Sequence, residues 1–520
     1  METFIESFSA GVDAVDSFVW GWALIWLLLG THLFMTIRTG FIQRKIPTAI
    51  KLSVSKNDPY AEGDISQFGA LTTALAATIG TGNIVGVATG LLCGGPGAIF
   101  WMWLTGVFGI ATKYSETYIS MKYRVKDANG RMLGGAMYAL ERGFKHKGLG
   151  KLLAVLFALF TAIASFGIGA SVQSNSLAGA LTSSSLIPGA SEIPTWLIGI
   201  VVTVLVAIVI IGGLKKVSKV CEKLVPVMAI FYVACCLVII GMNGAYLWDA
   251  IVTIITCAFT GQAAFGGAVG SGIMLALQYG FKRGLFSNES GLGSAPLVAA
   301  SAISKNPARQ ALVSMSGTFW DTVVICLITG LMLVTSLLAN PDLAAIYNNT
   351  MLASTDLSID TAVGIFSGGA ALATACFESI PVLGPLVLVV GLLCFTYSTM
   401  LGWSQYGDRA ITYLFGTKGI RPYQVVFLLF VFWGCIGGGD LVWNLSDISN
   451  ALMAVPNCIA VLVLSGVIAK GTKYWIYEGR LEEEDTTPIP TVGTVDHPQR
   501  LANARISASM LAAEKREHNC

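Results

Sequence analysis

The stretch ATIGTGNIVGVATG, residues 77–90, places closely spaced glycines in a strongly apolar part of the sequence. Its core, GTGNIVG, has the glycine spacing of a loop that holds a dinucleotide phosphate. Such a loop must follow a β-strand and open a helix within a βαβ unit. Here SQFGALTTALA precedes it and LLCGGPGAIFWMWLTG follows it, and both are apolar. The stretch therefore predicts a helix that glycines interrupt. Glycines used only for close helix packing would account better for Gly86 and Gly90 than for the cluster Gly80 and Gly82.

The composition predicts a protein of the lipid bilayer. Of the 520 residues, 54% are hydrophobic and only 12% are charged, whereas soluble domains carry roughly 25% charged residues. The net charge of +2 gives no sign of a nucleic-acid partner. The cysteines lie mostly inside apolar segments and form no CxxC pair, which is typical of small buried side chains and not of metal ligands.

Eleven apolar runs are long enough to be membrane spans, because a helix needs roughly 20 apolar residues to cross the hydrocarbon core. The run at 423–436 is the shortest of them. The predicted spans are 18–37, 66–92, 97–121, 152–180, 195–213, 224–242, 250–279, 311–339, 383–407, 423–436 and 441–469.

The lysines and arginines predict how these spans are oriented. They fill the connections 38–65, 122–151, 214–223 and 280–310 and are absent from every alternate connection. Because cytoplasmic loops carry the excess of lysine and arginine, we expect the N-terminus outside and the C-terminus in the cytoplasm. The protein is then a multi-pass protein of the inner (plasma) membrane of the cell.

Ten of the spans divide into two sets of five that run in opposite directions, 66–242 and 250–470. Each set opens with a helix that glycines interrupt, and the second interruption is GQAAFGGAVGSG, residues 261–272. Interrupted helices at matching positions of an inverted repeat indicate the binding site of a transporter. Residues 1–65 then hold the extracellular N-terminus, an extra helix and a cytoplasmic connection, and 471–520 form a cytoplasmic tail that we expect to be flexible.

The chain resembles the alanine/glycine:cation symporter family over about residues 60–470. The resemblance rests on SQFGALTTALAATIGTGNIVGVATG, GGPGAIFWMW, FGIGASVQSNSLA and FSNESGLGSAP. It implies a LeuT-like fold, with five plus five inverted helices and one extra N-terminal helix. It also implies sodium-coupled uptake of alanine or glycine into prokaryotic cells.

The two breaks predict where a small neutral amino acid binds. Backbone amides of Thr81 and Gly82 at a half-helix N-terminus suit the substrate carboxylate, while Asn83 either contacts the substrate or caps the second half-helix. Carbonyls of the second break suit the ammonium, and a ring there could cover the substrate. The residues expected there are Phe265, Gly266 and Gly267. The resemblance favours Gln173 as a further contact, the alternative being an interhelical hydrogen bond. Trp403 either closes the pocket from the inner side or lies in lipid.

The expected cation is sodium, which prefers carbonyl and hydroxyl oxygens. Ser398 and Thr399, together with the carbonyls of Ala76 and Ile79, would form a site resembling the second sodium site of LeuT-like transporters. The alternative is that both hydroxyls bond only to their own helix. Sodium is favoured over the proton because 66–92, 250–279 and 383–407 hold no Asp, Glu, His, Lys or Arg. Asp321 lies deep in a span and belongs either to the ion path or gate or to an interhelical contact.

We therefore expect a secondary symporter that imports alanine, glycine or both with sodium by alternating access. A channel or a proton-coupled carrier for a small solute is the alternative. A membrane enzyme is disfavoured because titratable groups are scarce near the midplane, and no obligate protein partner is implied. The choice among alanine, glycine and glutamine, the preferred enantiomer, the sodium stoichiometry and the oligomeric state stay open.

Overall fold

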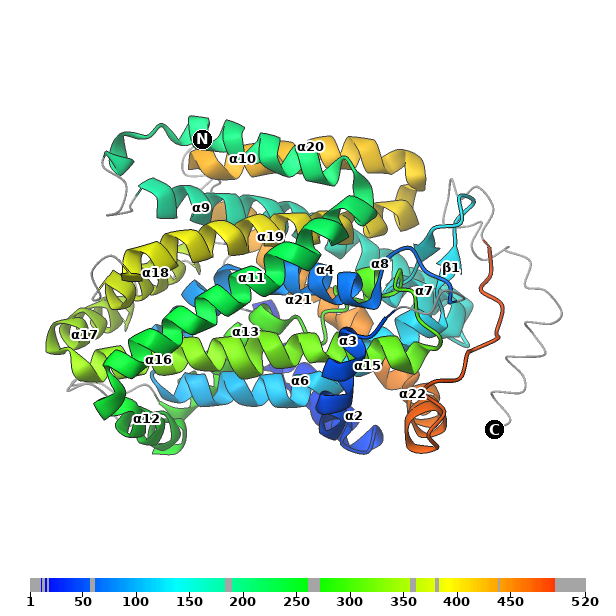
Figure 1. The fold of residues 1–520 in the computed structure, drawn as a ribbon, viewed down its shortest axis with the longest axis horizontal. Helices are drawn as coiled ribbons and strands as arrows, with labels where there is room; N and C mark the ends of the chain where they lie inside the picture. The colour runs from blue at the N-terminus through cyan, green and yellow to red at the C-terminus, as the bar shows by residue number, and fades with distance from the viewer. Residues whose placement is uncertain are drawn as a thin grey trace.

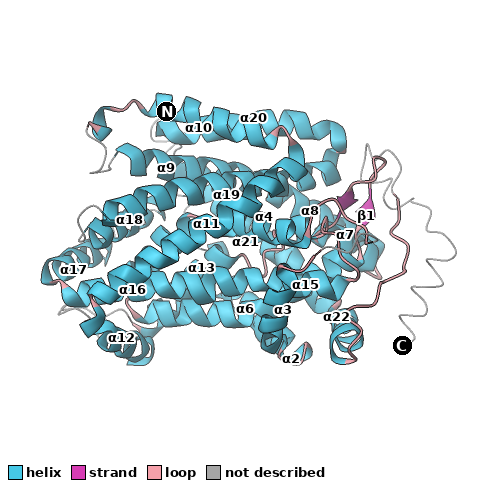
Figure 2. Ribbon diagram, in the orientation of Figure 1, coloured by secondary structure: helices cyan, strands magenta, loops and turns pink. Residues whose placement is uncertain are grey.

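The computed structural model describes residues 18–56, 61–182, 189–260, 272–355, 362–378, 383–437 and 440–491, together with Gly11 and Val15. Within these residues the chain is mostly helical, and its regular strands form one short hairpin, β1 (Val125–Lys126) paired with β2 (Met132–Leu133) (Figure 2). The predicted α-helical class is confirmed for this part of the chain.

The helices of the N-terminal half are α2 (Trp22–Arg38), α3 (Ile46–Ser53), α4 (Gln67–Thr78), α5 (Val87–Gly94), α6 (Gly97–Lys122), α7 (Ala136–Gly143), α8 (Lys147–Phe166), α9 (Val172–Thr182), α10 (Thr195–Ile210) and α11 (Gly213–Met242). Those of the C-terminal half are α12 (Leu247–Thr260), α13 (Ile273–Asn288), α14 (Pro296–Ala299), α15 (Pro307–Thr318), α16 (Leu327–Ala339), α17 (Pro341–Thr355), α18 (Ala362–Glu378), α19 (Leu383–Phe415), α20 (Ile420–Gly437), α21 (Asp440–Val463) and α22 (Ser465–Thr472).

Five described helical segments are long and apolar enough to cross a bilayer: Lys147–Thr182, Gly213–Met242, Pro307–Ala339, Gly384–Phe415 and Thr417–Gly437. Three bent pairs raise this number to eight if each pair is one span, namely Trp22–Arg38 with Ile42–Ser53, Gln67–Thr78 with Gly82–Gly94, and Asp447–Val463 with Ser465–Tyr477. Thr195–Ile210 and Gly244–Thr260 are apolar but shorter. The total of eleven spans and the division at 66–242 and 250–470 therefore stay predictions.

The long helices run roughly parallel and form a bundle with two distinct ends (Figure 1). α10 and α20 pack together along one edge, and α12 packs against α6 at the opposite edge. α4 lies between them, against α11 and α19. The hairpin, α7 and α22 gather at one end, and α17 lies at the other. Because α4 is central, its broken end is surrounded by protein on several sides.

The first predicted break is present in the structure. α4 begins at Gln67, and the hydroxyl of the preceding Ser66 caps the helix by accepting the Gly69 N–H at 2.7 Å. It ends at Thr78, since Ile79 turns to an extended conformation with ψ 95°. The chain resumes as a π-helical turn at Gly82–Gly86 and continues into α5, and the two halves are bent by 55°. The second predicted break, with Phe265, Gly266 and Gly267, lies outside the described residues.

Glycines bring the backbones around the break into close contact. A Cβ added at Gly402 of α19 would lie 2.7 Å from the Ala77 backbone nitrogen of α4. A Cβ added at Gly280 of α13 would lie 2.6 Å from the Ala98 carbonyl oxygen of α6. Small residues of this kind let membrane helices approach closely where apolar burial drives little association. The contacts fix α19 beside the end of α4.

The end of the bundle that holds the hairpin carries the lysine-containing connection 122–151, and we call it the lysine-rich end. Main-chain hydrogen bonds close it. The Asp64 N–H donates to the Ser301 carbonyl and the Ile303 N–H to the Ile65 carbonyl, both at 2.8 Å. Arg124 reinforces this closure by donating to the carbonyls of Ala300, at 3.3 Å, and Ala302, at 3.1 Å. Burial lowers the pKa of Arg124 to about 10, so its guanidinium stays charged at neutral pH.

The chain beyond α21 continues along the bundle up to residue 491. α22 passes into a π-helical turn at Lys473–Tyr477. Glu482 then forms an ion pair of 2.7 Å with Arg309, and the Pro490 carbonyl accepts the Lys126 N–H at 2.8 Å. Residues up to 491 thus lie across both the hairpin and the connection before α15. Residues 492–520 lie outside the described part.

Candidate functional site

Three π-helical turns surround the middle of the bundle, and each carries or adjoins a polar side chain. They are Gly82–Gly86 after the break, Gly167–Ser171 before α9, and Phe319–Cys326 between α15 and α16. A π turn shifts the helical register and occurs frequently at functional sites. The polar residues are Asn83, Gln173 and Asp321, and each is at most 2% exposed.

Asn83 holds the break in shape with both ends of its amide. Its Oδ1 accepts the Gly80 N–H at 2.9 Å, which would bond the Ala76 carbonyl if the helix continued. Its Nδ2 donates to Asp321 Oδ1 at 2.8 Å and to Ser287 Oγ at 3.1 Å. These contacts hold the break itself together, and no described side chain caps the N-terminus of the second half-helix.

Asp321 is fully buried and accepts hydrogen bonds from three neutral groups. In addition to Asn83, the hydroxyls of Ser287 and Thr322 donate to its Oδ2 at 2.8 and 2.7 Å. A buried carboxyl group is costly without hydrogen-bond partners, and these three donors supply them. Asp321 therefore joins the break to the end of α13 and to the turn after α15, the interhelical contact that the sequence left as one of two possibilities.

Gln173 presents an unpaired oxygen toward the break. Its Nε2 donates to the Ile168 carbonyl at 3.1 Å and lies 3.4 Å from Thr81 Oγ1. Its Oε1 is buried and has no hydrogen-bond partner among the described residues. A Cβ added at Gly80 would lie 3.5 Å from this oxygen. Because buried polar atoms are almost always paired, the oxygen marks a place where a donor belongs.

Buried polar atoms without a described partner also lie on α19, and two of them belong to neighbouring rings. They are Trp403 Nε1 and the Tyr406 hydroxyl, whose rings meet edge to face with centroids 5.3 Å apart. The Trp403 side chain occupies the space that a Cβ on Gly169 would need, so it packs against the turn before Gln173. Its indole is 1% exposed and lies within the protein, not in lipid.

The residues predicted to hold sodium divide into two groups. Thr399 Oγ1 lies 3.3 Å from the Ile79 carbonyl oxygen, at the end of α4. The Ser398 hydroxyl instead donates to the Phe395 carbonyl of its own helix at 2.9 Å and lies 3.5 Å from Met228 Sδ. The structure brings Thr399 and the Ile79 carbonyl together, one helical turn after Ala76. Ser398 instead bonds to its own helix, which is the alternative to sodium binding that the sequence left open.

The structure thus gathers Thr81, Gly82, Asn83, Gln173 and Thr399 around one break. A Cβ added at Gly82 would lie 3.4 Å from the Ser287 Cα, so α13 closes the other side. Sequence reasoning missed Ser287 and Tyr406 as neighbours of this site. Tyr406 follows Trp403 by three residues, and that helical spacing was a usable signal.

A buried ion pair supports the connection after α13. Lys113 Nζ lies 3.4 Å from Glu116 Oε1, and both side chains are at most 3% exposed. Lys113 also donates to the Glu289 carbonyl at 3.1 Å, and Glu116 accepts the Asn457 amide at 2.8 Å and the Gly291 N–H at 3.2 Å. This pair anchors the FSNESGLGSAP segment to α6 and α21.

Replacing Lys113 with methionine is expected to lower thermal stability strongly. Removing one partner of a buried ion pair leaves an uncompensated charge and costs about 3–5 kcal/mol. The double variant Lys113→Met/Glu116→Gln should recover much of this loss, because it removes both charges. Thermal unfolding of the three proteins in one detergent measures the effect, and a double variant less stable than Lys113→Met would contradict it.

Comparison with known proteins identifies the family. The sequence model of the sodium:alanine symporter family matches residues 5–488 of this chain. The chain belongs to this family. It is therefore a multi-pass membrane transporter and not an enzyme, and its family couples a small amino acid to sodium. The resemblance noted in the sequence is confirmed.

Two relatives and one solved structure place the chain more closely. It is 50% identical to the sodium/alanine symporter AgcS of Methanococcus maripaludis over 89% of this chain and 96% of that protein. It is 33% identical to GlnT of Bacillus subtilis, named "Probable sodium/glutamine symporter", over 89% of each chain. MhsT, solved in complex with L-phenylalanine, matches with a TM-score of 0.51 at 16% identity, over 79% of this chain and 93% of that one. This last similarity shows the LeuT-like fold alone.

Proposed function

We propose that this protein imports alanine, glycine or both together with sodium by alternating access at the break after α4. The observation that carries the proposal is the unpaired, buried Gln173 Oε1 beside a broken membrane helix. The ammonium group of a substrate, or a water molecule, can donate a hydrogen bond to that oxygen. Thr81 and Gly82 start a helical segment, where N–H groups lack intrahelical partners and attract a carboxylate.

The remaining N–H donors of the substrate ammonium are assigned to the second break. Carbonyls of Phe265, Gly266 and Gly267 would receive the ammonium, and the Phe265 ring would cover the substrate. Trp403 would close the pocket from the side of the lysine-rich end.

Sodium would bind between α4 and α19. Thr399 Oγ1 and the Ile79 carbonyl oxygen are already 3.3 Å apart. The Gly80 N–H, which would donate to the Ala76 carbonyl in a continuous helix, donates to Asn83 Oδ1 instead. Both carbonyls lie at the C-terminal end of α4, where the helix dipole favours a cation. Ser398 would join them only after its hydroxyl leaves the Phe395 carbonyl.

The protein is proposed to lie in the cell membrane with its N-terminus outside and its C-terminus in the cytoplasm. In that orientation the closure formed by residues 64–65 and 301–303 faces the cytoplasm. It must open for substrate release. One charge crossing 100 mV gives about 2.3 kcal/mol and a tenfold sodium gradient about 1.4 kcal/mol, enough for accumulation of a few hundredfold.

The test is uptake of labelled alanine, glycine and glutamine into proteoliposomes with the sodium, lithium or proton gradient imposed separately. We expect alanine or glycine to accumulate above its outside concentration only with sodium. Accumulation with a proton gradient alone would assign the protein to proton-coupled carriers. Equilibration without accumulation under every gradient would make it a channel.

Thr399→Val is expected to raise the sodium concentration for half-maximal uptake by about tenfold, because it removes an oxygen ligand worth roughly 1.5 kcal/mol. Ser398→Ala should raise it by less than threefold, since that hydroxyl bonds its own helix. Sodium titration of alanine uptake compares the two neighbouring substitutions. Equal effects would show that Ser398 is also a ligand.

A further inference from the structure

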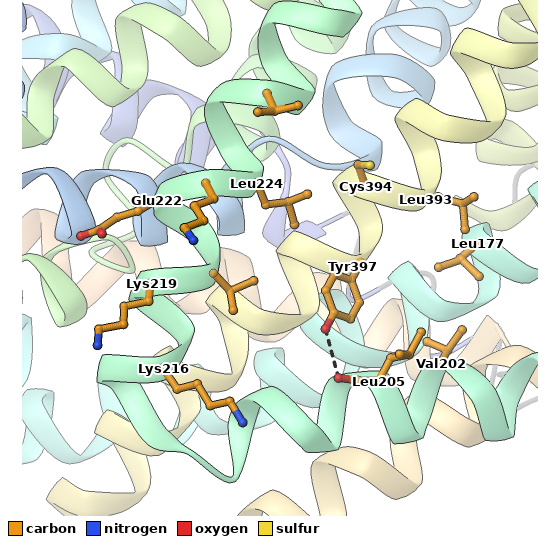
Figure 3. Close-up of a pocket in the computed structure, with 13 residues that line it drawn as sticks. Leu177, Val202, Leu205, Lys216, Lys219, Glu222, Leu224, Leu393, Cys394 and Tyr397 are labelled. Carbon is orange, nitrogen blue, oxygen red and sulfur yellow. Dashed lines mark hydrogen bonds between the residues drawn. The ribbon is translucent and has the colours of Figure 1, made fainter.

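A groove of about 860 Å³ lies on the flank of the bundle between α9, α10, α11 and α19 (Figure 3). Its apolar wall includes Leu177 of α9, Val202 and Leu205 of α10, and Leu393 of α19. Tyr397 turns its hydroxyl into a 3.0 Å bond with the Leu205 carbonyl, which leaves its ring facing the groove. Leu205 and Val227 remain 49% and 68% exposed, so the groove opens toward the surrounding lipid.

Positive charge gathers at one end of this groove. Lys216, Lys219 and Lys223 line it from the beginning of α11, and all three are exposed. Lys216 extends toward α10 and donates to the Ile208 carbonyl at 2.7 Å (Figure 3). Glu222 also lines the groove, but its Oε1 accepts the Ser66 hydroxyl of α4 at 2.5 Å. The lysine charge at this end is therefore only partly offset.

The groove has an apolar wall and ends at three lysines, so it is complementary to a lipid with a hydrocarbon chain and an anionic headgroup. Basic pockets between membrane helices bind anionic lipid headgroups in this way. We infer that the groove binds an anionic phospholipid, with an acyl chain along Leu177, Val202 and Leu393 and its phosphate among Lys216, Lys219 and Lys223. A zwitterionic lipid fits the same apolar wall but carries no net charge for the lysines.

The bound lipid would lie next to the part of the bundle that must move during transport. α11, which forms one wall of the groove, packs directly against α4. Gly69 of α4 leaves no room for a Cβ between itself and Ser218 and Glu222 of α11. A lipid that steadies α11 therefore changes how readily the first half of the broken helix moves. The expected consequence is an uptake rate that depends on anionic lipid.

The test compares lipid retention by the intact, full-length protein in native mass spectrometry. The probes are dioleoyl phosphatidylglycerol and dioleoyl phosphatidylcholine, which share their acyl chains. The wild type should retain phosphatidylglycerol about tenfold better, since each lysine near the headgroup contributes to anion binding. The variant Lys216→Gln/Lys219→Gln/Lys223→Gln should lower this preference below about twofold.

The matched control is Lys145→Gln/Lys147→Gln/Lys151→Gln, which removes the same charge near the start of α8, away from the groove. It should keep the wild-type preference. Equal loss in the control, or no loss in the groove variant, overturns the inference. The inference is also overturned if the wild type is a dimer and the groove variant is a monomer, because a second copy of the chain would then occupy the groove.

Two further measurements separate this inference from the proposed transport activity. Val227→Trp narrows the groove from an exposed position and should lower the retention of both lipids. Sodium-driven alanine uptake in vesicles of increasing phosphatidylglycerol content should rise for the wild type and stay flat for the groove variant. Uptake that is present but insensitive to this lipid in both proteins removes the lipid site and leaves the symporter intact.

Discussion

Asp321→Ala is expected to reduce sodium-driven amino-acid uptake by about a hundredfold, which corresponds to roughly 3 kcal/mol. The carboxylate accepts hydrogen bonds from Asn83, Ser287 and Thr322. Its removal leaves these donors unpaired in a buried site, at about 1–3 kcal/mol each. Since Asn83 also holds the Gly80 N–H, the break itself loses its shape. Initial uptake rates in proteoliposomes with matched protein content measure the loss.

Asp321→Asn is the informative companion to this variant. Its amide keeps one acceptor oxygen and nearly the same volume, so uptake should fall by about tenfold only, one hydrogen bond being worth roughly 1.5 kcal/mol. Both variants must first elute as the wild type does in size-exclusion chromatography. Wild-type uptake by Asp321→Ala would show that the three donors find other partners and that the network is dispensable.

Gln173→Ala is expected to raise the alanine concentration for half-maximal uptake by about tenfold to a hundredfold. A hydrogen bond to a charged group contributes about 1.5–3 kcal/mol, and Gln173 Oε1 is the buried acceptor left open beside Gly80. The maximal rate should change less than the apparent affinity, because the side chain contacts substrate and not the gate. Concentration series at saturating sodium separate the two quantities.

Asn175→Ala provides the matched control on the same helix. Its amide donates to the Gly434 carbonyl of α20 at 3.2 Å and so faces away from the break. Its removal should leave the alanine affinity within about threefold of the wild type, because the substitution removes one neutral hydrogen bond that does not reach the substrate. If Asn175→Ala weakened alanine binding as much as Gln173→Ala, the effect would come from α9 packing and not from a substrate contact.

The first break could be predicted from the sequence because two local signals agree there. Glycines at 80 and 82 weaken the helix, and the apolar flanks place it in the bilayer. A helix that must end within lipid leaves backbone groups that need partners, and this is why the sequence predicts a site at the break. The family followed from the same residues and the motifs around them.

The partners of that site could not be predicted in the same way. Asn83 and Asp321 are 238 positions apart, and only the packing of α13 and the turn after α15 brings them together. Thr399 and Ser398 are adjacent, yet only Thr399 faces the break. Their directions depend on the rotation of α19 about its axis. Hydropathy does not determine that rotation, because a helix surrounded by protein and lipid is apolar on most faces.

The closure at the lysine-rich end is made by peptide groups of residues 64–65 and 301–303, and this has a consequence for how its gating can be found. Trimming side chains one at a time to alanine leaves these main-chain bonds intact, so a conventional scan would report only the loss of side-chain contacts, such as those of Asp64 with the Met132 N–H and of Ser301 with Arg409. The same latch can also persist through evolution while its residues drift. Only a change to the backbone itself removes such a bond, as a proline at position 303 would by abolishing the amide that donates to the Ile65 carbonyl.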